Sequence, residues 1–362
     1  MKVAIVTDLP NWYDDTMYLN ELEKRLAKSG IGCKVFVIEG SKIFEKIDTN
    51  TGFFRFLNIS KLLKKLSDFD IIHVQFTFPL GFGCTLLASL RLLNKPIIIH
   101  THGYDVFTVP SINYGLRRKY LGKIFTNYTW RRANRIITVC KKAKLEIEKT
   151  GINDDKINVL HNGIDENLFK KTKNIYSKEL SMLRENSDIL FLSVASIVPV
   201  KNHVRMLKAF EKLVDKYHSK YKIKLALIGE QRNDSLLNGA HSNVVYLGKK
   251  KHSELSNFYS IANAFILPSL SEAHPWSMLE AMSCELPIIA SNVGGIPETI
   301  DDSRFLVNPM DEQDILKKFE LITEMNSSER EKIGFENRNK ILRRFTFDIH
   351  LKYLQKIYEE VL

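Results

Sequence analysis

Two glutamates, Glu272 and Glu280, flank the junction between a predicted strand that ends at Ser269 and a helix that begins near Pro275. Glu280 lies inside the helix, where its carboxylate is expected to accept hydrogen bonds from both hydroxyls of a ribose. Charge-assisted hydrogen bonds of this kind contribute about 1.5–3 kcal/mol. Glu272 lies on the loop and is expected to face the group beyond the phosphates. The alternative interpretation is two exposed glutamates without a ligand.

The first turn of this predicted helix offers a second kind of chemistry. Proline is tolerated at the start of a helix, because the first N–H groups have no intrahelical acceptor. These N–H groups bind phosphate readily, and the helix dipole adds about 0.3–1 kcal/mol. The candidate diphosphate-binding residues of this turn are Trp276, Ser277 and Met278. Because the dipole is weak, a basic side chain is expected to assist.

Alternating strands and helices must position these residues. Short runs rich in Val and Ile are separated by helical patterns, which is typical of parallel sheets covered on both faces. The pattern restarts after a polar stretch at 170–188. We therefore predict an α/β protein with two doubly wound, Rossmann-like domains at 1–172 and 173–345. The amphipathic segment 346–362 is expected to pack back on the first domain. Ligands of such sheets bind beyond the carboxyl ends of the strands.

Composition excludes several classes of protein. With 44% hydrophobic and 26% charged residues, the chain fits neither a disordered nor a fibrous protein. No apolar run is long enough to span a membrane, and the first ten residues do not resemble a signal peptide. The four cysteines are far apart, which favours a reducing cytosol. The motifs typical of plain dinucleotide binding, P-loop phosphoryl transfer, serine hydrolysis and zinc proteolysis do not occur.

The stretch 268–300 resembles the donor site of the GT-B glycosyltransferases often called glycosyltransferase family 4. That pattern reads approximately P-S-x-x-E-G-F-P-x-x-x-x-E-A-M-A-x-G-x-P-V-I-A-x-x-x-G-G-x-P-E. The matching residues here are Pro268, Ser269, Glu272, Pro275, Glu280, Ala281, Met282, Pro287, Ile288, Ala290, Gly294, Gly295, Pro297 and Glu298. The resemblance extends along nearly the whole chain. It implies the GT-B architecture, in which two Rossmann-like domains face each other across a cleft.

Two further segments resemble the same family. SVASIVPVKNHVRMLKAF (193–210) resembles the segment that carries a diphosphate-binding Arg and Lys, and Lys201 is the implied lysine. HTHGYD (100–105) resembles the H-G-x-D segment. There the resemblance implies that His102 contacts the transferred sugar or the charge that develops at its anomeric carbon. A solvated lysine and a hydrogen-bonded core histidine are the competing interpretations.

The chain also departs from the family pattern. Ala195 and Ser196 stand where the family has Gly-Arg, so the diphosphate lacks its usual guanidinium, and Arg205 or Arg232 are candidates to replace it. Ser196 and Gly229, the glycine of a shortened G-x-G-P turn, complete the candidate donor-binding residues.

Two further departures affect the acceptor side and the donor loop. The loop LPNWYDD (9–15) replaces a Gly-Gly loop, so the acceptor details of the family do not transfer, and His274 replaces an aromatic residue.

The resemblance implies a retaining glycosyltransferase that moves a sugar from a nucleoside diphosphate sugar to an acceptor hydroxyl. Lys201 and the helix N–H groups are expected to stabilise the departing phosphate, with His102 and Glu272 as the other catalytic residues. No D-x-D motif follows a suitable strand, so no metal ion and no cofactor besides the nucleotide sugar are expected. The expected acceptor is a glycan or a lipid-linked intermediate of cell-surface polysaccharide or glycolipid synthesis. A sugar-nucleotide epimerase or phosphorylase, or a catalytically silent nucleotide-sugar-binding module, are the alternatives.

The net charge of +11 lies wholly in the first half of the chain. Residues 1–173 hold 28 basic and 17 acidic side chains, whereas 174–362 hold 25 of each. The stretch 111–135 has seven basic residues and no acidic one. We expect its basic residues to face the acceptor or an anionic membrane surface on the cytoplasmic side; the candidates are Arg117, Arg118, Lys119 and Lys123. The alternative is a helix that packs its apolar side on the first domain. Nucleic acid is not expected as a partner, because no reading motif is present.

Overall fold

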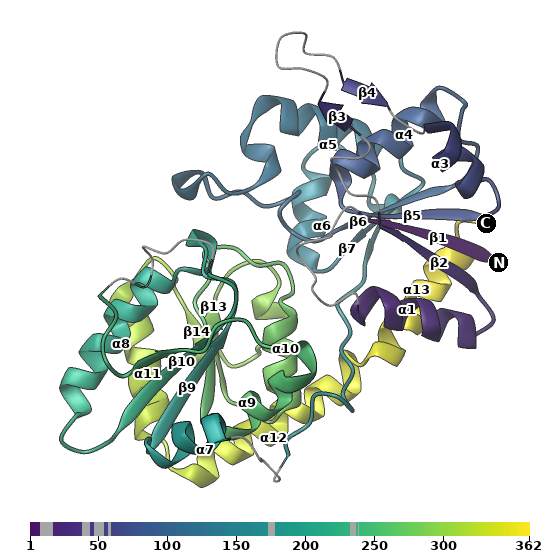
Figure 1. Cartoon of the computed structure of the whole chain (residues 1–362). Coiled ribbons are helices and arrows are strands. Elements are labelled where there is room, and N and C mark those ends of the chain that lie inside the picture. The colour runs from purple at the N-terminus through teal and green to yellow at the C-terminus, as the bar shows by residue number, and fades with distance from the viewer. Residues whose placement is uncertain are drawn as a thin grey trace. The chain divides into compact units, whose positions relative to one another are not determined.

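The protein folds into two compact units (Figure 1). The structure, a computed structural model, describes residues 1–7, 17–37, 44–46, 54–56, 59–172, 178–231, 237 and 239–362. The first unit comprises Met1–Leu160 and Leu351–Leu362, and the second comprises His161–His350. The units thus divide before the sequence-based boundary at residue 172. The loop 9–15 and Arg232 lie outside the described residues.

The first unit is built on a parallel sheet of six strands in the order β2-β1-β5-β6-β7-β8. The strands are β1 (Lys2–Thr7), β2 (Gly32–Val37), β5 (Ile71–Gln75), β6 (Ile97–Thr101), β7 (Arg135–Thr138) and β8 (Ile157–Val159). Every residue of β5 and β6 is buried, as expected for strands covered on both faces. A separate antiparallel pair joins β3 (Phe44–Lys46) to β4 (Phe54–Phe56).

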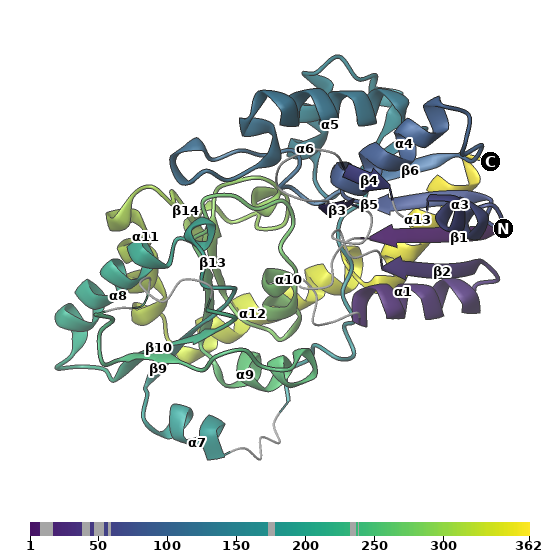
Figure 2. The same ribbon diagram turned by 45° about the horizontal axis from the view of Figure 1, so that its top comes forward.

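Helices cover both faces of this first sheet. They are α1 (Met17–Lys28), α3 (Ile59–Leu66), α4 (Phe82–Ser89), α5 (Tyr120–Arg132), α6 (Lys141–Glu148) and α13 (Phe347–Glu359). Both views place α1 and α13 on one face and α4 and α5 on the other (Figures 1 and 2). The last helix begins in the second unit and ends in the first.

The second unit repeats the architecture with the strand order β11-β10-β9-β12-β13-β14. Its strands are β9 (Ile189–Val194), β10 (Ile223–Ile228), β11 (Val244–Tyr246), β12 (Ala264–Leu267), β13 (Ile288–Ser291) and β14 (Leu306–Val307). All pairings are parallel. In chain order this is the 3-2-1-4-5-6 arrangement of dinucleotide-binding sheets. The predicted α/β class with two doubly wound sheets is therefore confirmed.

Two layers of helices enclose the second sheet. They are α7 (Lys178–Glu185), α8 (His203–Tyr217), α9 (Leu255–Ile261), α10 (Trp276–Ser283), α11 (Glu312–Glu324) and α12 (Ser327–Arg344). Figure 1 shows α8 and α11 on one face, with α9, α10 and α12 on the other. Phe319 of α11 meets Phe191 and Phe210 edge-on, with ring centroids 4.8 and 5.7 Å away. Such pairs add about 0.5–1.5 kcal/mol beyond their buried area.

A helical pattern over residues 115–133 of the sequence predicts one continuous helix, and this prediction is wrong at its start. Leu116–Arg118 form a separate 3-10 turn, and Lys119 is extended, with φ −97° and ψ 147°. Gly122 accounts for the break, because a Cβ there would lie 2.0 Å from the Leu116 carbonyl oxygen. The turn thus packs directly on the first turn of α5. No helix among the described residues combines the length and apolarity needed to cross a membrane.

Three buried histidines of the second unit are held neutral. Nδ1 of His274 accepts from the Asn162 N–H at 3.1 Å, and burial keeps the pKa of His274 well below its usual value. Nδ1 of His350 lies 2.8 Å from the His161 carbonyl oxygen, and burial lowers the pKa of His350 to about 4. Burial and the neighbouring Lys201 lower the pKa of His203 to about 4.

We predict that the second unit loses stability below about pH 6.5, the usual histidine pKa. Below this pH, the histidines of the unfolded chain bind protons, whereas the buried histidines of the folded chain stay unprotonated. Their contribution is complete above that pH and is lost as pH falls toward 4, at up to about 1.4 kcal/mol per pH unit per histidine. Urea unfolding between pH 7.5 and 4.5 measures this slope. His350→Asn should reduce it, whereas His218→Asn, at an exposed position, should not. An unfolding free energy that is the same at both pH values contradicts the prediction.

Candidate active site

Lys201 and Glu272 meet where the second sheet changes direction. The chain leaves β9 toward β10 on one side, and β12 lies on the other. Ligands of such sheets bind at this switch point, beyond the carboxyl ends of the strands. Lys201 follows β9, Glu272 follows β12, and Nζ of the lysine lies 2.6 Å from Oε1 of the glutamate. The structure thus brings two of the predicted catalytic residues into direct contact.

A tight turn fixes the backbone of Lys201. The lysine ends a 3-10 turn, Pro199–Lys201, and the next residue, Asn202, is left-handed with φ 61°. Asparagine tolerates this conformation better than other non-glycine residues. The Asn202 amide donates to the carbonyl oxygens of Pro268 at 2.9 Å and Pro309 at 2.7 Å. The turn is therefore tied to the strand end that precedes Glu272.

The Gly-Gly turn supports Glu272 from the other side. Gly294 has φ 54°, and a Cβ there would lie 1.6 Å from the Glu272 carbonyl oxygen. No side chain fits at that distance. The next residue, Gly295, donates its N–H to the Ala273 carbonyl oxygen at 2.8 Å. The conformation and the small size of this turn together hold the loop that carries Glu272.

Helix α10 begins at Trp276, directly after Pro275, as the sequence predicted. The side chain of Met278 is fully buried, so only its backbone is available to a ligand. Trp276 and Ser277 are half-buried. The first N–H groups of the helix have no intrahelical acceptor and point beyond its end. Diphosphate binding at this turn stays a prediction.

Ser196 and Gly229 lie side by side at the ends of β9 and β10. Gly229 has φ 155°, and a Cβ there would lie 2.0 Å from the Ala195 carbonyl oxygen and 3.0 Å from the Ser196 nitrogen. The glycine therefore allows a close approach of two backbones. Arg205, a candidate to replace the missing arginine, donates to Oδ1 of Asn202 at 3.1 Å and so belongs to the turn after Lys201.

Glu280 is bonded to protein groups, which the sequence did not reveal. Its side chain is buried, and its two oxygens face His252 Nε2 at 2.8 Å and the Tyr259 hydroxyl at 2.9 Å. Burial and the Glu280 carboxylate raise the pKa of Tyr259 well above its usual value. A carboxylate oxygen accepts more than one hydrogen bond, so ribose binding by Glu280 stays a prediction.

His102 belongs to the first unit, where Asp105 fixes its turn. One Asp105 oxygen accepts from the Thr77 N–H at 3.1 Å and hydroxyl at 2.7 Å. The other lies 3.3 Å from both the His102 and the Gly103 nitrogens. Burial raises the pKa of Asp105, and these hydrogen bonds oppose that shift. The aspartate of the H-G-x-D segment thereby joins the loops that follow β5 and β6.

Arg117 does not belong to the predicted membrane or acceptor surface. Its guanidinium lies 4.7 Å from the Trp130 ring centroid, and it donates to Asn127 Oδ1 at 2.7 Å and to the Thr126 hydroxyl. Trp130 in turn donates to the Thr77 hydroxyl at 3.0 Å. The reason is the separate turn before α5, which directs Arg117 inward. Arg117 therefore supports the loops around His102.

The other members of the predicted surface have different surroundings. Arg118 is half-buried and donates to the Gly115 carbonyl oxygen at 2.9 Å. Lys119 and Lys123 are exposed. Three large apolar side chains between and beside them are also exposed, by 77%, 61% and 43%: Tyr120, Leu121 and Ile124. The alternative, that these apolar residues pack on the first domain, is wrong for the start of α5.

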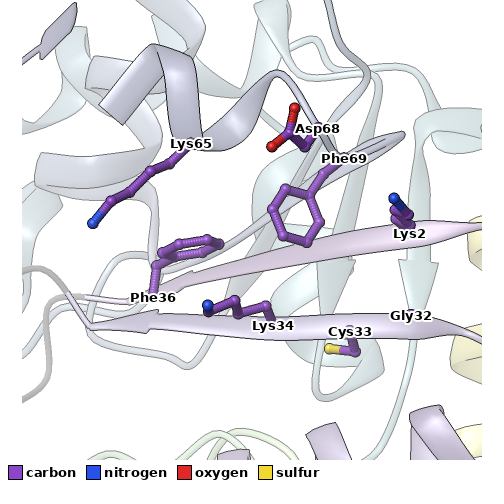
Figure 3. Close-up of a pocket in the computed structure, with 8 residues that line it drawn as sticks. All are labelled: Lys2, Gly32, Cys33, Lys34, Phe36, Lys65, Asp68 and Phe69. Carbon is purple, nitrogen blue, oxygen red and sulfur yellow. The ribbon is translucent and has the colours of Figure 1, made fainter. Parts of the chain in front are cut away.

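A pocket of about 520 Å³ lies elsewhere in the first unit, beside β1 and β2. Figure 3 shows Lys34 and Phe36 on β2, with Lys65 and Phe69 facing them across the pocket. The two aromatic rings meet edge-on at 5.5 Å. No predicted site residue lines this pocket. In the part of the chain that the structure describes, no three His, Cys, Asp or Glu side chains form a metal-binding group, and metal independence stays a prediction.

Known proteins resemble the chain in sequence. A family model described as "Glycosyltransferase Family 4" matches residues 16–168, and one described as "Glycosyl transferases group 1" matches residues 180–340. The capsular polysaccharide biosynthesis glycosyltransferase CapM of Staphylococcus aureus is 28% identical over 328 residues, covering 85% of this chain and 82% of CapM. The uncharacterized glycosyltransferase MJ1178 of Methanocaldococcus jannaschii is 25% identical over 311 residues, which cover 84% of this chain and 79% of that protein.

Solved structures share the fold. Anabaena HepE, in complex with UDP and glucose, has a TM-score of 0.78 at 16% identity, covering 99% of this chain and 100% of HepE. Sucrose-phosphate synthase from Thermosynechococcus elongatus has a TM-score of 0.76 at 17% identity, covering 99% and 98%. These structures show the GT-B fold alone. The two family matches, one to each half, identify the chain as a glycosyltransferase that resembles family 4 at residues 16–168 and the group 1 enzymes at residues 180–340.

Proposed function

We propose that this glycosyltransferase transfers a sugar from a nucleoside diphosphate sugar to an acceptor hydroxyl, with retention of configuration and without a metal ion. The observation that carries the proposal is the ion pair between Lys201 and Glu272 at the switch point of the second sheet. Glu272 lies four residues before the first turn of α10. A cation, a carboxylate and a helix N-terminus thus stand together.

The donor is a nucleoside diphosphate sugar because these groups match its parts. The ammonium of Lys201 and the first N–H groups of α10 neutralise the diphosphate. The Glu272 carboxylate accepts from sugar hydroxyls, and its bond to Lys201 fixes its direction. The structures of HepE with UDP and with UDP-glucose support a uridine nucleotide as the first donor to test.

The reaction breaks the bond between the anomeric carbon and the β-phosphate oxygen. The acceptor oxygen forms the new bond on the same face of the sugar, and its proton passes to the departing phosphate oxygen. Negative charge grows on the leaving group, where Lys201 and the helix N–H groups stabilise it. Positive charge grows at the anomeric carbon, where the family resemblance implies that His102 contacts the sugar. The products are a glycoside and a nucleoside diphosphate.

The acceptor is a glycan or a lipid-linked intermediate of cell-surface polysaccharide or glycolipid synthesis. The resemblance to CapM, a capsular polysaccharide biosynthesis enzyme, supports this class. The exposed start of α5 supports a peripheral location on an anionic, cytoplasmic membrane face, because it mixes Lys119 and Lys123 with Tyr120, Leu121 and Ile124. Apolar side chains enter the interface, while basic ones attract anionic lipid.

Lys201→Ala should lower kcat by roughly 100- to 1,000-fold, as expected for removal of one group that stabilises transition-state charge. The assay is release of nucleoside diphosphate in the presence of acceptor. Lys208→Ala is the matched control, because Lys208 is exposed on α8, the helix that follows Lys201. Equal rates for the two variants would reject the proposed site, and nucleotide release that needs no acceptor would reject glycosyl transfer.

Gly294→Ala should impair both turnover and stability. The new Cβ would clash with the Glu272 carbonyl oxygen and displace that loop, which we expect to lower kcat by about 100-fold. Gly248→Ala is the control, because Gly248 also has a positive φ, +67°, but nothing lies within 4 Å of its added Cβ. Gly248→Ala should lose about 1–2 kcal/mol of unfolding free energy from its positive φ alone, and Gly294→Ala should lose more, because its Cβ also clashes with the backbone. A Gly294→Ala enzyme with the turnover of Gly248→Ala contradicts the supporting role of this turn.

Lys119→Glu combined with Lys123→Glu should weaken binding to vesicles that contain anionic lipid. Each basic residue near such a surface contributes about 1 kcal/mol, so the loss should be at least roughly 30-fold. Vesicle co-sedimentation measures the change. Lys24→Glu with Lys28→Glu, on exposed positions of α1, makes the same change in net charge elsewhere on the first unit. Equal losses in both double variants would attribute binding to net charge alone and exclude this surface.

A further inference from the structure

A row of polar side chains crosses one face of the first sheet. His73 and Gln75 of β5 are two residues apart, and so are His100 of β6 and His102 just beyond it. Alternate residues of a strand point to the same face. The register pairs Gln75 with His100, so all four side chains share one face. Buried strands of a parallel sheet are otherwise apolar, so this polar row requires a reason.

Hydrogen bonds connect the row from His102 to the last helix. Nε2 of His102 lies 2.7 Å from Oε1 of Gln75. Nε2 of Gln75 lies 3.3 Å from Nε2 of His73. Nδ1 of His73 lies 2.7 Å from the hydroxyl of Tyr358, on α13. His73, Gln75 and Tyr358 are all buried.

The amide of Gln75 determines which ring nitrogens carry protons. Its Oε1 only accepts, so Nε2 of His102 must donate. Its Nε2 only donates, so Nε2 of His73 must accept. The proton of His73 then lies on Nδ1 and is donated to the Tyr358 oxygen. One arrangement of protons therefore satisfies the whole chain: His102 carries a proton on Nε2, and His73 carries its proton on Nδ1.

Ring contacts fix the planes of the same histidines. The His100 ring stacks on His73 at 5.4 Å and 12° and on His102 at 4.5 Å and 24°. Phe76 contacts the His102 ring at 4.7 Å. Phe76 adopts φ 72°, a conformation that costs energy for a non-glycine residue and that persists only where the surroundings impose it. Its position follows Gln75 directly, so one segment contacts His102 twice.

We propose that Gln75 is a positioning residue for His102, whose Nε2 it keeps protonated by accepting its hydrogen bond, with His73 and Tyr358 completing the support. This inference rests on the proposed function, in which His102 lies near the reacting sugar. The row fixes the direction of the hydrogen bond at Nε2, and the stacked rings fix the plane of His102.

The first test reads the tautomer directly. In ¹⁵N NMR spectra of the full chain, His102 should be protonated at Nε2. Gln75→Leu removes the acceptor and should give a mixture of tautomers. Gln75→Glu keeps an oxygen that accepts from His102, so Nε2 of His102 should stay protonated. The new carboxylate cannot donate to His73. His73 can then move its own proton to Nε2, because the Tyr358 hydroxyl can donate to Nδ1 instead.

The second test separates kcat from KM. Gln75→Leu should lower kcat by roughly 10- to 100-fold, because catalytic groups tolerate little displacement. The KM for the donor should change by less than about twofold, because the donor groups Lys201 and Glu272 belong to the second unit. Gln75→Glu should recover part of the lost turnover.

A third variant tests the far end of the chain. Tyr358→Phe removes the hydroxyl that receives the His73 proton, so the ¹⁵N resonance of His73 Nδ1 should shift while Gln75 keeps the proton on that nitrogen. Tyr353→Phe is the matched control, because this tyrosine is on the same helix but 60% exposed. Thermal melting verifies that each variant folds. If Gln75→Leu does not fold, the spectra of Gln75→Glu and Tyr358→Phe still decide the direction of the hydrogen bonds.

Two outcomes distinguish failure of the inference from failure of the proposed function. A Gln75→Leu enzyme with the His102 tautomer and the kcat of the parent overturns the positioning role. If His102→Ala keeps the turnover of the parent, the role of His102 in the reaction is overturned. The positioning role still stands if the Gln75 variants change the tautomer of His102 in the parent background. A His73 Nδ1 resonance unchanged by Tyr358→Phe removes Tyr358 from the proposal.

Discussion

The ion pair between Lys201 and Glu272 is held by turns that follow different strands of the second sheet. Two opposite charges at 2.6 Å satisfy each other without a ligand, and they remain partly hydrated because neither is fully buried. Two contacts fix their backbones. The Asn202 amide donates to two carbonyl oxygens, and Gly294 packs against the Glu272 backbone. A diphosphate sugar can then bind to groups already in place, so little ordering entropy is lost on binding.

In the sequence, a serine precedes Lys201 where the family pattern has an arginine. Ser196 occupies the position of the usual guanidinium, and Arg205 is engaged with the Asn202 side chain. The charge excess lies in the first half of the chain, whereas residues 174–362 are balanced. If the second unit binds the donor as proposed, recognition depends on the placement of few charges. Exposed lysines of the basic first half lie at the start of α5.

Sequence alone predicted what depends on local pattern. Both parallel sheets, the start of α10 and the positions of Lys201 and Glu272 follow from strand runs, Pro275 and spacing. It missed contacts made between distant segments. His252 lies 28 residues before the Glu280 that it contacts, and no local spacing joins them. Arg117 points inward because the helix is interrupted at Lys119. The interruption accompanies the close contact between Leu116 and Gly122, which the sequence pattern does not show. The alternation of His73 with Gln75 was a usable signal, because polar residues are rare in buried strands.

The last helix has a consequence for the order in which the protein is completed. The first unit contains residues 351–362, which leave the ribosome after the entire second unit. N-terminal domains generally fold first during synthesis, but here the sheet face that carries His73 lacks Tyr358 until the second unit has been made. Until then, the surface that α13 covers stays open. The hydrogen-bonded row that ends at His102 is therefore complete only after synthesis of both units.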